Sequence, residues 1–269
     1  MSKTFIIAEA GSSWQIGLRQ SGRLAHAIKC IKVAKHCGAD ACKFQWTSQP
    51  TEMAKRRHMT NPGAYAHLAW PEKWLHILAA ECEQESIEFM CTVFLPVDVE
   101  TIAPLVKRLK VASLEAGSKT FCQVCVDTKK PVLISTGAAF METFRDRHAN
   151  LGWSSWGNVK VLHCIAAYPA PIEQMNLSCI LRQGMHGLSD HSGDLLTGAL
   201  AVAAGAEIIE VHFRLWNTPQ ANPDYKHSHD PHGLGDYIDN IRKAELMLGD
   251  GVKKVEDCER PMLKHLVTA

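Results

Sequence analysis

The sequence predicts an α/β protein, specifically a (β/α)8 TIM barrel folded as a single domain. Eight short runs rich in β-branched and apolar residues recur along the 269-residue chain, and helix-like stretches separate them. Such alternation is typical of parallel strands joined by crossover helices. Eight strand–helix units favour a closed barrel over an open sheet. We expect strands at residues 4–10, 39–45, 87–93, 109–113, 131–137, 158–164, 185–191 and 207–213.

Amphipathic stretches predict the crossover helices, most clearly at 23–38, 72–86 and 195–206. The glycine-bearing junctions "HCGAD" and "AAGAE", just before the second and eighth strands, fit helix C-caps. The longest irregular stretches, 46–69 and 214–231, follow those same two strands. We assign residues 1–255 to the barrel and residues 256–269 to a C-terminal tail.

Composition argues against several classes of partner and compartment. The net charge of +1 gives no global attraction to nucleic acid. No apolar segment is long enough to span a bilayer, and the apolar run near the N-terminus is too short for a signal peptide. Ten cysteines are scattered through helical and strand segments, as in a reduced cytoplasmic protein. Cys122 and Cys125 lie three positions apart in a helical segment, which predicts a pair packed in the core.

Polar side chains gather where the predicted strands end, which is where (β/α)8 barrels carry their chemistry. Packing alone would favour Val, Ile and Leu there, so the set as a whole predicts an active site. Single members, such as Glu210 or His163, are also explained as ordinary buried hydrogen-bonding residues. The strand-end residues are Glu9, Lys43, Gln45, Thr92, Lys110, Ser113, Ser135, Thr136, His163, Cys164, Ser189, Asp190, His191, Glu210 and His212.

Two features of this set indicate its chemistry. Lys43 and Lys110, with the hydroxyls of Thr92, Ser113 and Ser135, predict a pocket for a small phosphate- or carboxylate-bearing substrate.

The second feature is that His191 and His212 end neighbouring strands. Such strands lie about 4.8 Å apart, so both rings can reach one metal ion with coordination positions left open. Glu9 ends the first strand, next to the eighth in a closed barrel, where it can act as a base or contact metal-bound water. Spacing alone leaves metal binding and a hydrogen-bonded pair of rim histidines as equal alternatives.

The chain resembles the sialic acid synthase family, that is, N-acetylneuraminate synthase and its relatives for other nonulosonic acids. The resemblance rests on motifs in family order over nearly the whole chain. They include "IAEAGS" (7–12), "GADACKFQ" (38–45), "LKVAS" (109–113), "KPVLISTG" (130–137), "VLHCIAAYPAP" (161–171), "GLSDHSG" (187–193), "AAGAEIIEVHF" (203–213), "NPDYKHS" (222–228) and "LGDGVKK" (248–254).

This resemblance implies condensation of phosphoenolpyruvate with an amino-sugar aldehyde, giving a 2-keto-3-deoxy acid and phosphate. It implies a divalent metal on His191 and His212, with manganese first and magnesium or cobalt as alternatives, and Glu9 as the acid/base residue. The implied ligands of phosphoenolpyruvate are Lys43, Thr92, Lys110, Ser113, Ser135 and Ser189. Gln45, Tyr168 and Asp224 would face the acceptor sugar.

The sequence departs from the family pattern at three places. The usual "NHNG" after the first strand is "SSWQIG" (12–17), so we expect Trp14 to shrink the acceptor pocket. A commonly found asparagine is Ala166, which removes a phosphate ligand unless water or His163 replaces it. The family's small C-terminal lid domain, with its arginine for the sugar, is not found after "ERPMLKHLVTA". We therefore consider a homodimer or a separate lid protein as partners.

Other rim residues and other functions stay open. Trp14, Trp46, Trp153, Trp156 and Trp216 either wall an altered acceptor site or pack within loops. His227, His229 and His232 either bind a further metal or, as we expect, lie in a solvated loop. The alternative functions are a non-catalytic relative that binds a phosphorylated metabolite, and an aldolase that forms a Schiff base through Lys43 or Lys110.

Overall fold

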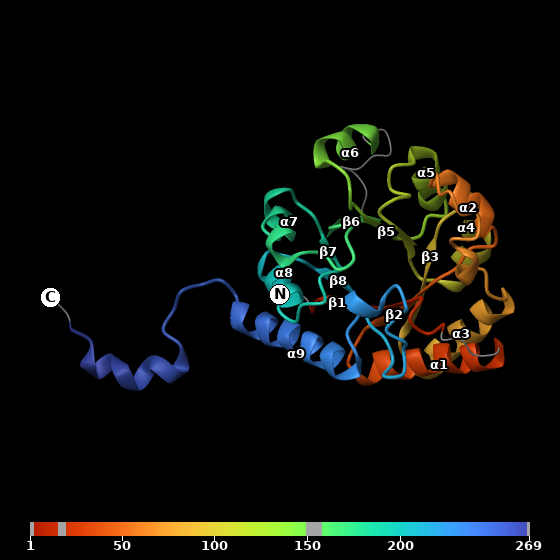
Figure 1. The fold of residues 1–269 in the computed structure, drawn as a ribbon. Helices are drawn as coiled ribbons and strands as arrows, with labels where there is room; N and C mark the ends of the chain where they lie inside the picture. Colours follow the sequence, from red (N-terminus) through yellow and green to blue (C-terminus); the bar gives the residue numbers. More distant parts are fainter. Residues whose placement is uncertain (1–2, 16–19, 149–157, 268–269) are drawn as a thin grey trace.

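The computed structural model describes residues 3–15, 20–148 and 158–267. Its eight strands form a closed parallel barrel in the order β1 to β8, which confirms the predicted TIM barrel (Figure 1). The strands are β1 Phe5–Gly11, β2 Ala41–Gln45, β3 Glu88–Val93, β4 Leu109–Val111, β5 Val132–Ser135, β6 Val159–Cys164, β7 Gly187–Asp190 and β8 Ile208–His212.

Helices connect the strands and cover the outside of the barrel (Figure 1). The α-helices are α1 Gln20–His36, α2 Pro50–Arg56, α3 Lys73–Gln84, α4 Pro96–Ile102, α5 Lys119–Asp127, α6 Met141–His148, α7 Cys179–Arg182, α8 Thr197–Ala203 and α9 Pro231–Leu248. Four three-residue 3-10 turns among the described residues are η1 Ala66–Leu68, η2 Ala103–Leu105, η4 Ile172–Gln174 and η5 Tyr225–His227, and a longer 3-10 segment is η6 Asp257–His265. The helices expected at 23–38, 72–86 and 195–206 correspond to α1, α3 and α8.

The interior of the barrel changes from apolar to polar along the strands. A small inner cluster of buried apolar side chains fills the lower part, and the residue two positions later on the same strand, with a charged, hydroxyl or thiol side chain, lies above it. This follows from the two-residue period of a strand, which keeps alternate side chains on one face. The pairs are Ile7 and Glu9, Ala41 and Lys43, Met90 and Thr92, Leu133 and Ser135, Leu162 and Cys164, and Ile208 and Glu210.

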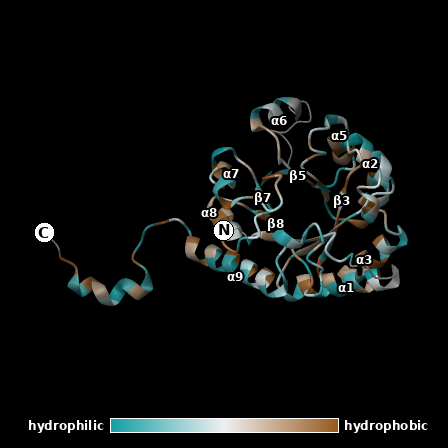
Figure 2. Ribbon diagram, viewed as in Figure 1, coloured by the Kyte–Doolittle hydropathy of each residue, from teal (hydrophilic) through white to brown (hydrophobic). Residues whose placement is uncertain are grey.

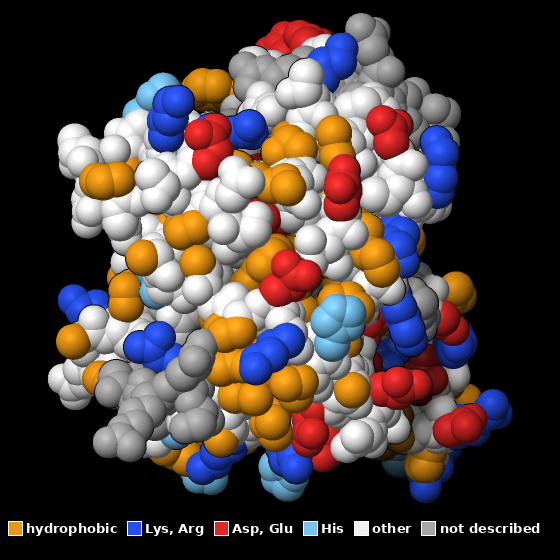
Figure 3. Space-filling view, turned by 90° about the vertical axis from the view of Figure 1, so that its right-hand side faces the viewer, with side chains coloured by type: hydrophobic (Ala, Val, Ile, Leu, Met, Phe, Trp, Pro, Cys, Tyr) orange, Lys and Arg blue, Asp and Glu red, His pale blue; other side chains and the backbone are white. Residues whose placement is uncertain are grey.

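A larger apolar layer lies between the strands and the surrounding helices. In Figure 2 brown and teal bands alternate along the outer helices, as expected for helices that bury one face against the barrel. Cys122 and Cys125 are buried free thiols in this layer on α5, as predicted. On the face shown in Figure 3, acidic and basic side chains are interspersed, in line with the small net charge.

The packed body ends with α9, whose last residue is Leu248. Residues 249–267 are exposed throughout and lead away from the barrel (Figure 1). The predicted boundary at residue 255 falls inside this exposed segment. Among the described residues, no helix combines the length and apolar character needed to cross a membrane.

Candidate active site

Two lysines and two glutamates meet inside the C-terminal mouth of the barrel. Lys43 forms an ion pair with Glu9, and its Nζ lies 3.5 Å from Oε2 of Glu210. The Nζ of Lys110 lies 3.5 Å from Oε1 of the same Glu210. All four side chains are buried. An unpaired charge in the interior is costly, so each of these groups is held in place by its opposite charges.

Hydroxyl groups complete the partners of these charges. The Nζ of Lys43 donates a 2.6 Å hydrogen bond to Oγ1 of Thr92, and Nζ of Lys110 donates a 2.9 Å bond to Oγ of Ser135. Ser189 donates a 2.9 Å bond to Oε1 of Glu210. These groups surround a cavity of about 50 Å³. Its lining includes all the predicted ligands of phosphoenolpyruvate, namely Lys43, Thr92, Lys110, Ser113, Ser135 and Ser189.

Burial and charge shift the protonation equilibria of the four groups in different directions. Burial raises the pKa of Glu9 to about 7, against the lowering effect of Lys43. Burial opposes ionisation of Glu210 too, but Lys110 and Lys43 lower its pKa to about 2. Burial lowers the pKa of Lys110. For Lys43 the nearby Glu210 and Glu9 outweigh burial and raise the pKa. Glu9 is therefore the group that can exchange a proton near neutral pH.

The predicted histidine pair lies beside this cavity. The ring centroids of His191 and His212 are 5.2 Å apart, so the neighbouring strand ends do bring the imidazoles together. Nδ1 of His191 donates a 2.9 Å hydrogen bond to the carbonyl of Ile165, which leaves Nε2 free to act as a ligand. Burial lowers the pKa of His191 to about 4 and that of His212 well below its usual value. Both rings are thus neutral, the form that binds metal ions.

A third histidine joins the pair because the stretch after β8 folds back over the barrel mouth. His229 donates a 3.0 Å backbone hydrogen bond to His212 and accepts a 2.8 Å bond from Arg214. This return places the ring of His227 4.7 Å from that of His212. The expected solvated loop is therefore wrong for His227 and His229, whose side chains are buried; His232 is exposed.

These residues fit a divalent metal ion. Within the described ranges, Nδ1 of His212 and both ring nitrogens of His227 are buried without a hydrogen bond. Ligand atoms of His212, Asp224 and His227 all lie within 4.8 Å of one another. Imidazole and carboxylate together suit first-row divalent metals. The assignment of His191 and His212 as ligands stays a prediction.

The predicted acceptor-facing residues lie around the same mouth. Nε2 of Gln45 donates a 3.2 Å hydrogen bond to Glu9, and the ring of Tyr168 lies 4.3 Å from that of His191. Oδ2 of Asp224 accepts bonds of 2.6 and 2.9 Å from the backbone N and the Oγ of Ser12. The short loop after β1 therefore holds Asp224 in place.

The structure corrects the expected role of Trp14. Its side chain is fully buried outside the barrel wall, against Phe44, Trp70 and Trp74, and its Nε1 donates a bond to Gly11. Trp46 is buried in the same aromatic group. Neither Trp14 nor Trp46 therefore narrows the acceptor pocket.

Trp216 is the other tryptophan of the predicted rim group that the structure describes. Trp216 is 57% exposed and contacts the ring of His232. Trp153, Trp156 and the end of "SSWQIG" lie outside the described residues.

His163 does not compensate for the alanine at position 166. Its Nε2 lies 2.7 Å from the carbonyl of Met175, on the helix side of β6. The next residue, Cys164, points inward instead and accepts a 3.3 Å bond from Ser113. Alternation along the strand therefore turns His163 away from the two lysines, and the ordinary buried interpretation holds for it.

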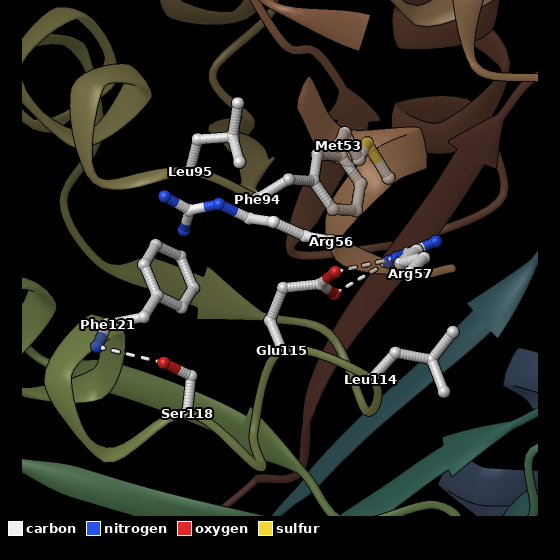
Figure 4. A pocket seen from close by; sticks show the side chains of 9 residues that line it. All are labelled: Met53, Arg56, Arg57, Phe94, Leu95, Leu114, Glu115, Ser118 and Phe121. Carbon is white, nitrogen blue, oxygen red and sulfur yellow. Dashed lines mark hydrogen bonds and ion pairs between the residues drawn. The ribbon is translucent and has the colours of Figure 1, made fainter. Parts of the chain in front are cut away.

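A second hollow, of about 350 Å³, lies beside α2 and α5 and contains no predicted site residue. Figure 4 shows its lining, in which Glu115 accepts hydrogen bonds of 2.7 and 2.6 Å from Arg57. The other arginine of the lining, Arg56, pairs with Glu52. Because both guanidinium groups already have a carboxylate partner, the hollow is a weaker anion site than the barrel mouth.

Sequence reasoning gives two central residues no specific role. Glu210 lies at a predicted strand end, but nothing local distinguishes it from a structural glutamate. His227 is one of three loop histidines with no feature that separates it from the others. The signal in the sequence is its three-residue spacing from Asp224, which the 3-10 turn η5 converts into proximity: Nε2 of His227 lies 3.7 Å from Oδ1 of Asp224.

The chain is similar to known proteins along almost its whole length. The profile of the NeuB family matches residues 30–253. The N,N'-diacetyllegionaminic acid synthase of Legionella pneumophila is 32% identical over 280 residues, covering 96% of this chain and 77% of that protein. The pseudaminic acid synthase of Campylobacter jejuni is 32% identical over 290 residues, covering 99% and 80%.

Among solved structures, the N-acetylneuraminic acid (sialic acid) synthetase of Leptospira borgpetersenii matches with a TM-score of 0.85. That match covers 98% of this chain and 91% of the other at 24% identity, so it bears on the fold alone.

Proposed function

The chain belongs to the NeuB family, and we propose that its barrel joins phosphoenolpyruvate to an amino-sugar aldehyde or a related aldose with the help of a divalent metal. Membership confirms the resemblance predicted from the sequence motifs. The chain is accordingly a transferase, a phosphoenolpyruvate-dependent carbon–carbon bond-forming synthase of the nonulosonic acid type. The observation that carries its assignment to this site is the buried Lys43–Glu210–Lys110 arrangement at the barrel mouth.

Lys43 and Lys110 hold the phosphate and carboxylate of phosphoenolpyruvate in this proposal. Their ammonium groups share Glu210, and Lys110 also donates to Ser135. Charge-assisted hydrogen bonds in a buried pocket are stronger than neutral ones. Further hydrogen-bond donors are the hydroxyls of Thr92, Ser113, Ser135 and Ser189. On binding, the anion therefore replaces its hydrogen bonds to water with hydrogen bonds to groups that are already in place.

The reaction forms one carbon–carbon bond and releases phosphate. The third carbon of phosphoenolpyruvate attacks the aldehyde carbon, water adds to the second carbon, and the bond to the phosphate group breaks. Glu9 holds or transfers a proton at this place, because burial brings its pKa to about 7. Its Oε1 is fixed by Gln45 and by a 2.6 Å bond from the backbone of Gly11.

His191 and His212 hold the metal ion in this proposal, with Mn²⁺ preferred and Mg²⁺ or Co²⁺ as substitutes. When bound, such an ion polarises the aldehyde oxygen as a Lewis acid. The supporting observations are the neutral, buried rings and the orientation of His191 by the carbonyl of Ile165.

The acceptor lies on the open side of the mouth, near Gln45, Tyr168 and Asp224. The side chain of Tyr168 is 57% exposed there, so the acceptor side is open to solvent. We propose that a second copy of the chain or a separate lid polypeptide covers it during turnover. We also propose a cytoplasmic location, supported by the ten free cysteines.

One observation favours the Schiff-base alternative. Burial lowers the pKa of Lys110, as an amine nucleophile requires. The hydroxyl of Ser135 and the carboxylate of Glu210 nevertheless give this lysine the surroundings of a charge clamp. Borohydride treatment with a keto acid separates the two chemistries, since a stable adduct on Lys110 requires the Schiff base.

The decisive experiment measures phosphate release from phosphoenolpyruvate by the purified chain. A panel of aldehydes, including N-acetylmannosamine and shorter aldoses, is tested with Mn²⁺ and with chelator. Release that depends on both aldehyde and metal is the expected result. Binding of phosphoenolpyruvate without release for any aldehyde would favour the non-catalytic alternative.

A further inference from the structure

We propose that His227 and Asp224 are metal ligands, so that the barrel mouth holds its ion with three histidines and one carboxylate. This inference rests on the proposed metal-dependent function and extends its ligand set beyond His191 and His212. The ligand is a first-row divalent cation that accepts several imidazoles, such as Mn²⁺, Fe²⁺ or Co²⁺. Mg²⁺, which prefers oxygen ligands and water, fits less well.

The burial of His227 is the first observation. His227 is 2% exposed, and neither of its ring nitrogens makes a hydrogen bond within the described part of the chain. A buried imidazole without hydrogen bonds has lost its bonds to water without compensation, which costs stability. A metal bond to one nitrogen removes part of that cost.

The position of the ring is the second observation. The centroid of His227 lies 4.7 Å from that of His212 and 6.1 Å from that of His191, so three imidazoles converge at the barrel mouth. Nδ1 of His212 is also buried without a hydrogen bond among the described residues.

Asp224 supplies the carboxylate. Its Oδ2 is occupied by the two bonds from Ser12, and its Oδ1 lies 3.7 Å from Nε2 of His227. That separation is too long for a hydrogen bond. Ligand atoms each about 2.1 Å from one ion lie at most about 4.2 Å apart, so the separation suits two ligands of a shared ion.

The backbone at Gly11 supports the same placement. Its φ is +49°, and a Cβ there would collide with the carboxylate of Asp224. Only glycine allows the loop after β1 to approach this closely while Ser12 orients Asp224. Ser12 is thus a positioning residue of the kind that fixes a ligating carboxylate from behind.

The test measures binding of Co²⁺ and Mn²⁺ by calorimetry, together with the visible absorption spectrum of the Co²⁺ form. The variants are His227→Ala and His227→Gln, which keeps much of the volume and hydrogen-bonding capacity. His232→Ala is the control, since it removes an exposed histidine from the same loop. The double variant His191→Ala/His212→Ala reports on the proposed pair, and thermal unfolding without metal shows whether each variant folds.

We expect both variants at residue 227 to bind Co²⁺ at least about tenfold more weakly, with an altered spectrum, and the control to match wild type. Wild-type affinity and spectrum in both variants would overturn the proposal. If only the alanine variant weakens binding, the ring acts by packing, which also overturns it. If only the double variant loses metal binding, His227 is not a ligand, and the proposed metal-dependent function stands. If both variants at residue 227 lose metal binding and the double variant does not, His227 is a ligand, and His191 and His212 are not the proposed ligand pair.

Discussion

The hydroxyl of Tyr237 donates a 2.7 Å hydrogen bond to Oδ2 of Asp190, and both side chains are buried. Tyr237 lies on α9 and Asp190 is the last residue of β7, so the bond ties the last helix to the strand that precedes His191. The other oxygen, Oδ1, accepts a 2.8 Å bond from the backbone of Ser192. The end of β7 is therefore held from two sides, immediately before a predicted metal ligand.

Tyr237→Phe should lower the free energy of unfolding by about 1–3 kcal/mol, because it leaves one oxygen of a buried carboxylate without its donor. Urea denaturation of the metal-free protein measures the change. The control is Tyr225→Phe on the loop after β8, whose ring contacts Arg214 in a cation–π arrangement that the substitution retains. Equal stability of the Tyr237→Phe variant and wild type would show that water takes the place of the hydroxyl.

Gly198→Ala should destabilise the protein because α8 touches the same tyrosine. A Cβ on Gly198 would lie 2.5 Å from Cζ and 2.6 Å from Oη of Tyr237, and overpacking of this kind costs about 1–3 kcal/mol. Gly235→Ala, on α9, is the matched control. A Cβ there meets nothing within 4 Å, so the variant should gain up to about 1 kcal/mol from helix propensity. Opposite signs in thermal or urea unfolding are expected, and a shared sign would contradict the packing described.

Much of this arrangement follows from patterns that are local in the sequence. The alternation of apolar runs and helical stretches predicted the barrel, because each strand must bury both faces and each helix one. The two-residue period then placed Glu9, Lys43 and Thr92 above Ile7, Ala41 and Met90 on the inner face. Closure of the barrel then brings these strand ends together, so their proximity follows from the predicted fold alone.

The remaining features depend on where loops return, which no local pattern specifies. His227 lies close to His212 because the backbone of His229 pairs with β8. Residues 214–231 contain no periodic pattern that predicts this pairing. Trp14 follows a strand end, which is why the sequence predicts it at the rim. The left-handed turn at Gly11 and the aromatic group around Trp70 draw it to the outer side of the wall instead.

Glu210→Gln should cost more stability than any surface charge change. The substitution leaves Lys43 and Lys110 buried without their shared carboxylate, and breaking a buried pair costs about 3–5 kcal/mol. Glu207→Gln is the control, since Glu207 pairs with Lys160 at the surface, where such pairs contribute about 0–1 kcal/mol. Urea denaturation of both variants makes the comparison. Similar losses in the two would mean that the lysines find other partners.

Lys110→Ala should weaken binding of phosphoenolpyruvate roughly 10- to 150-fold, the equivalent of about 1.5–3 kcal/mol for a charge-assisted hydrogen bond. Calorimetric titration without acceptor measures the affinity directly. Lys107→Ala removes an exposed lysine three positions earlier and should bind as wild type does. An unchanged affinity in the Lys110→Ala variant would show that Lys110 does not contribute to binding of phosphoenolpyruvate.

The metal-free protein should lose stability as the pH falls below about 6.5, and His163 is one identifiable cause. Burial lowers the pKa of His163 in the folded protein. The unfolded chain therefore takes up a proton first, and stability declines from the unfolded pKa towards the folded one, by at most about 1.4 kcal/mol per pH unit for one group. His163→Gln removes this titration, so its urea midpoint should change less between pH 7 and about pH 5 than that of wild type. His36→Gln, an exposed change on α1, should retain the wild-type slope. Parallel profiles for wild type and His163→Gln would show that the acid sensitivity arises at the other buried histidines.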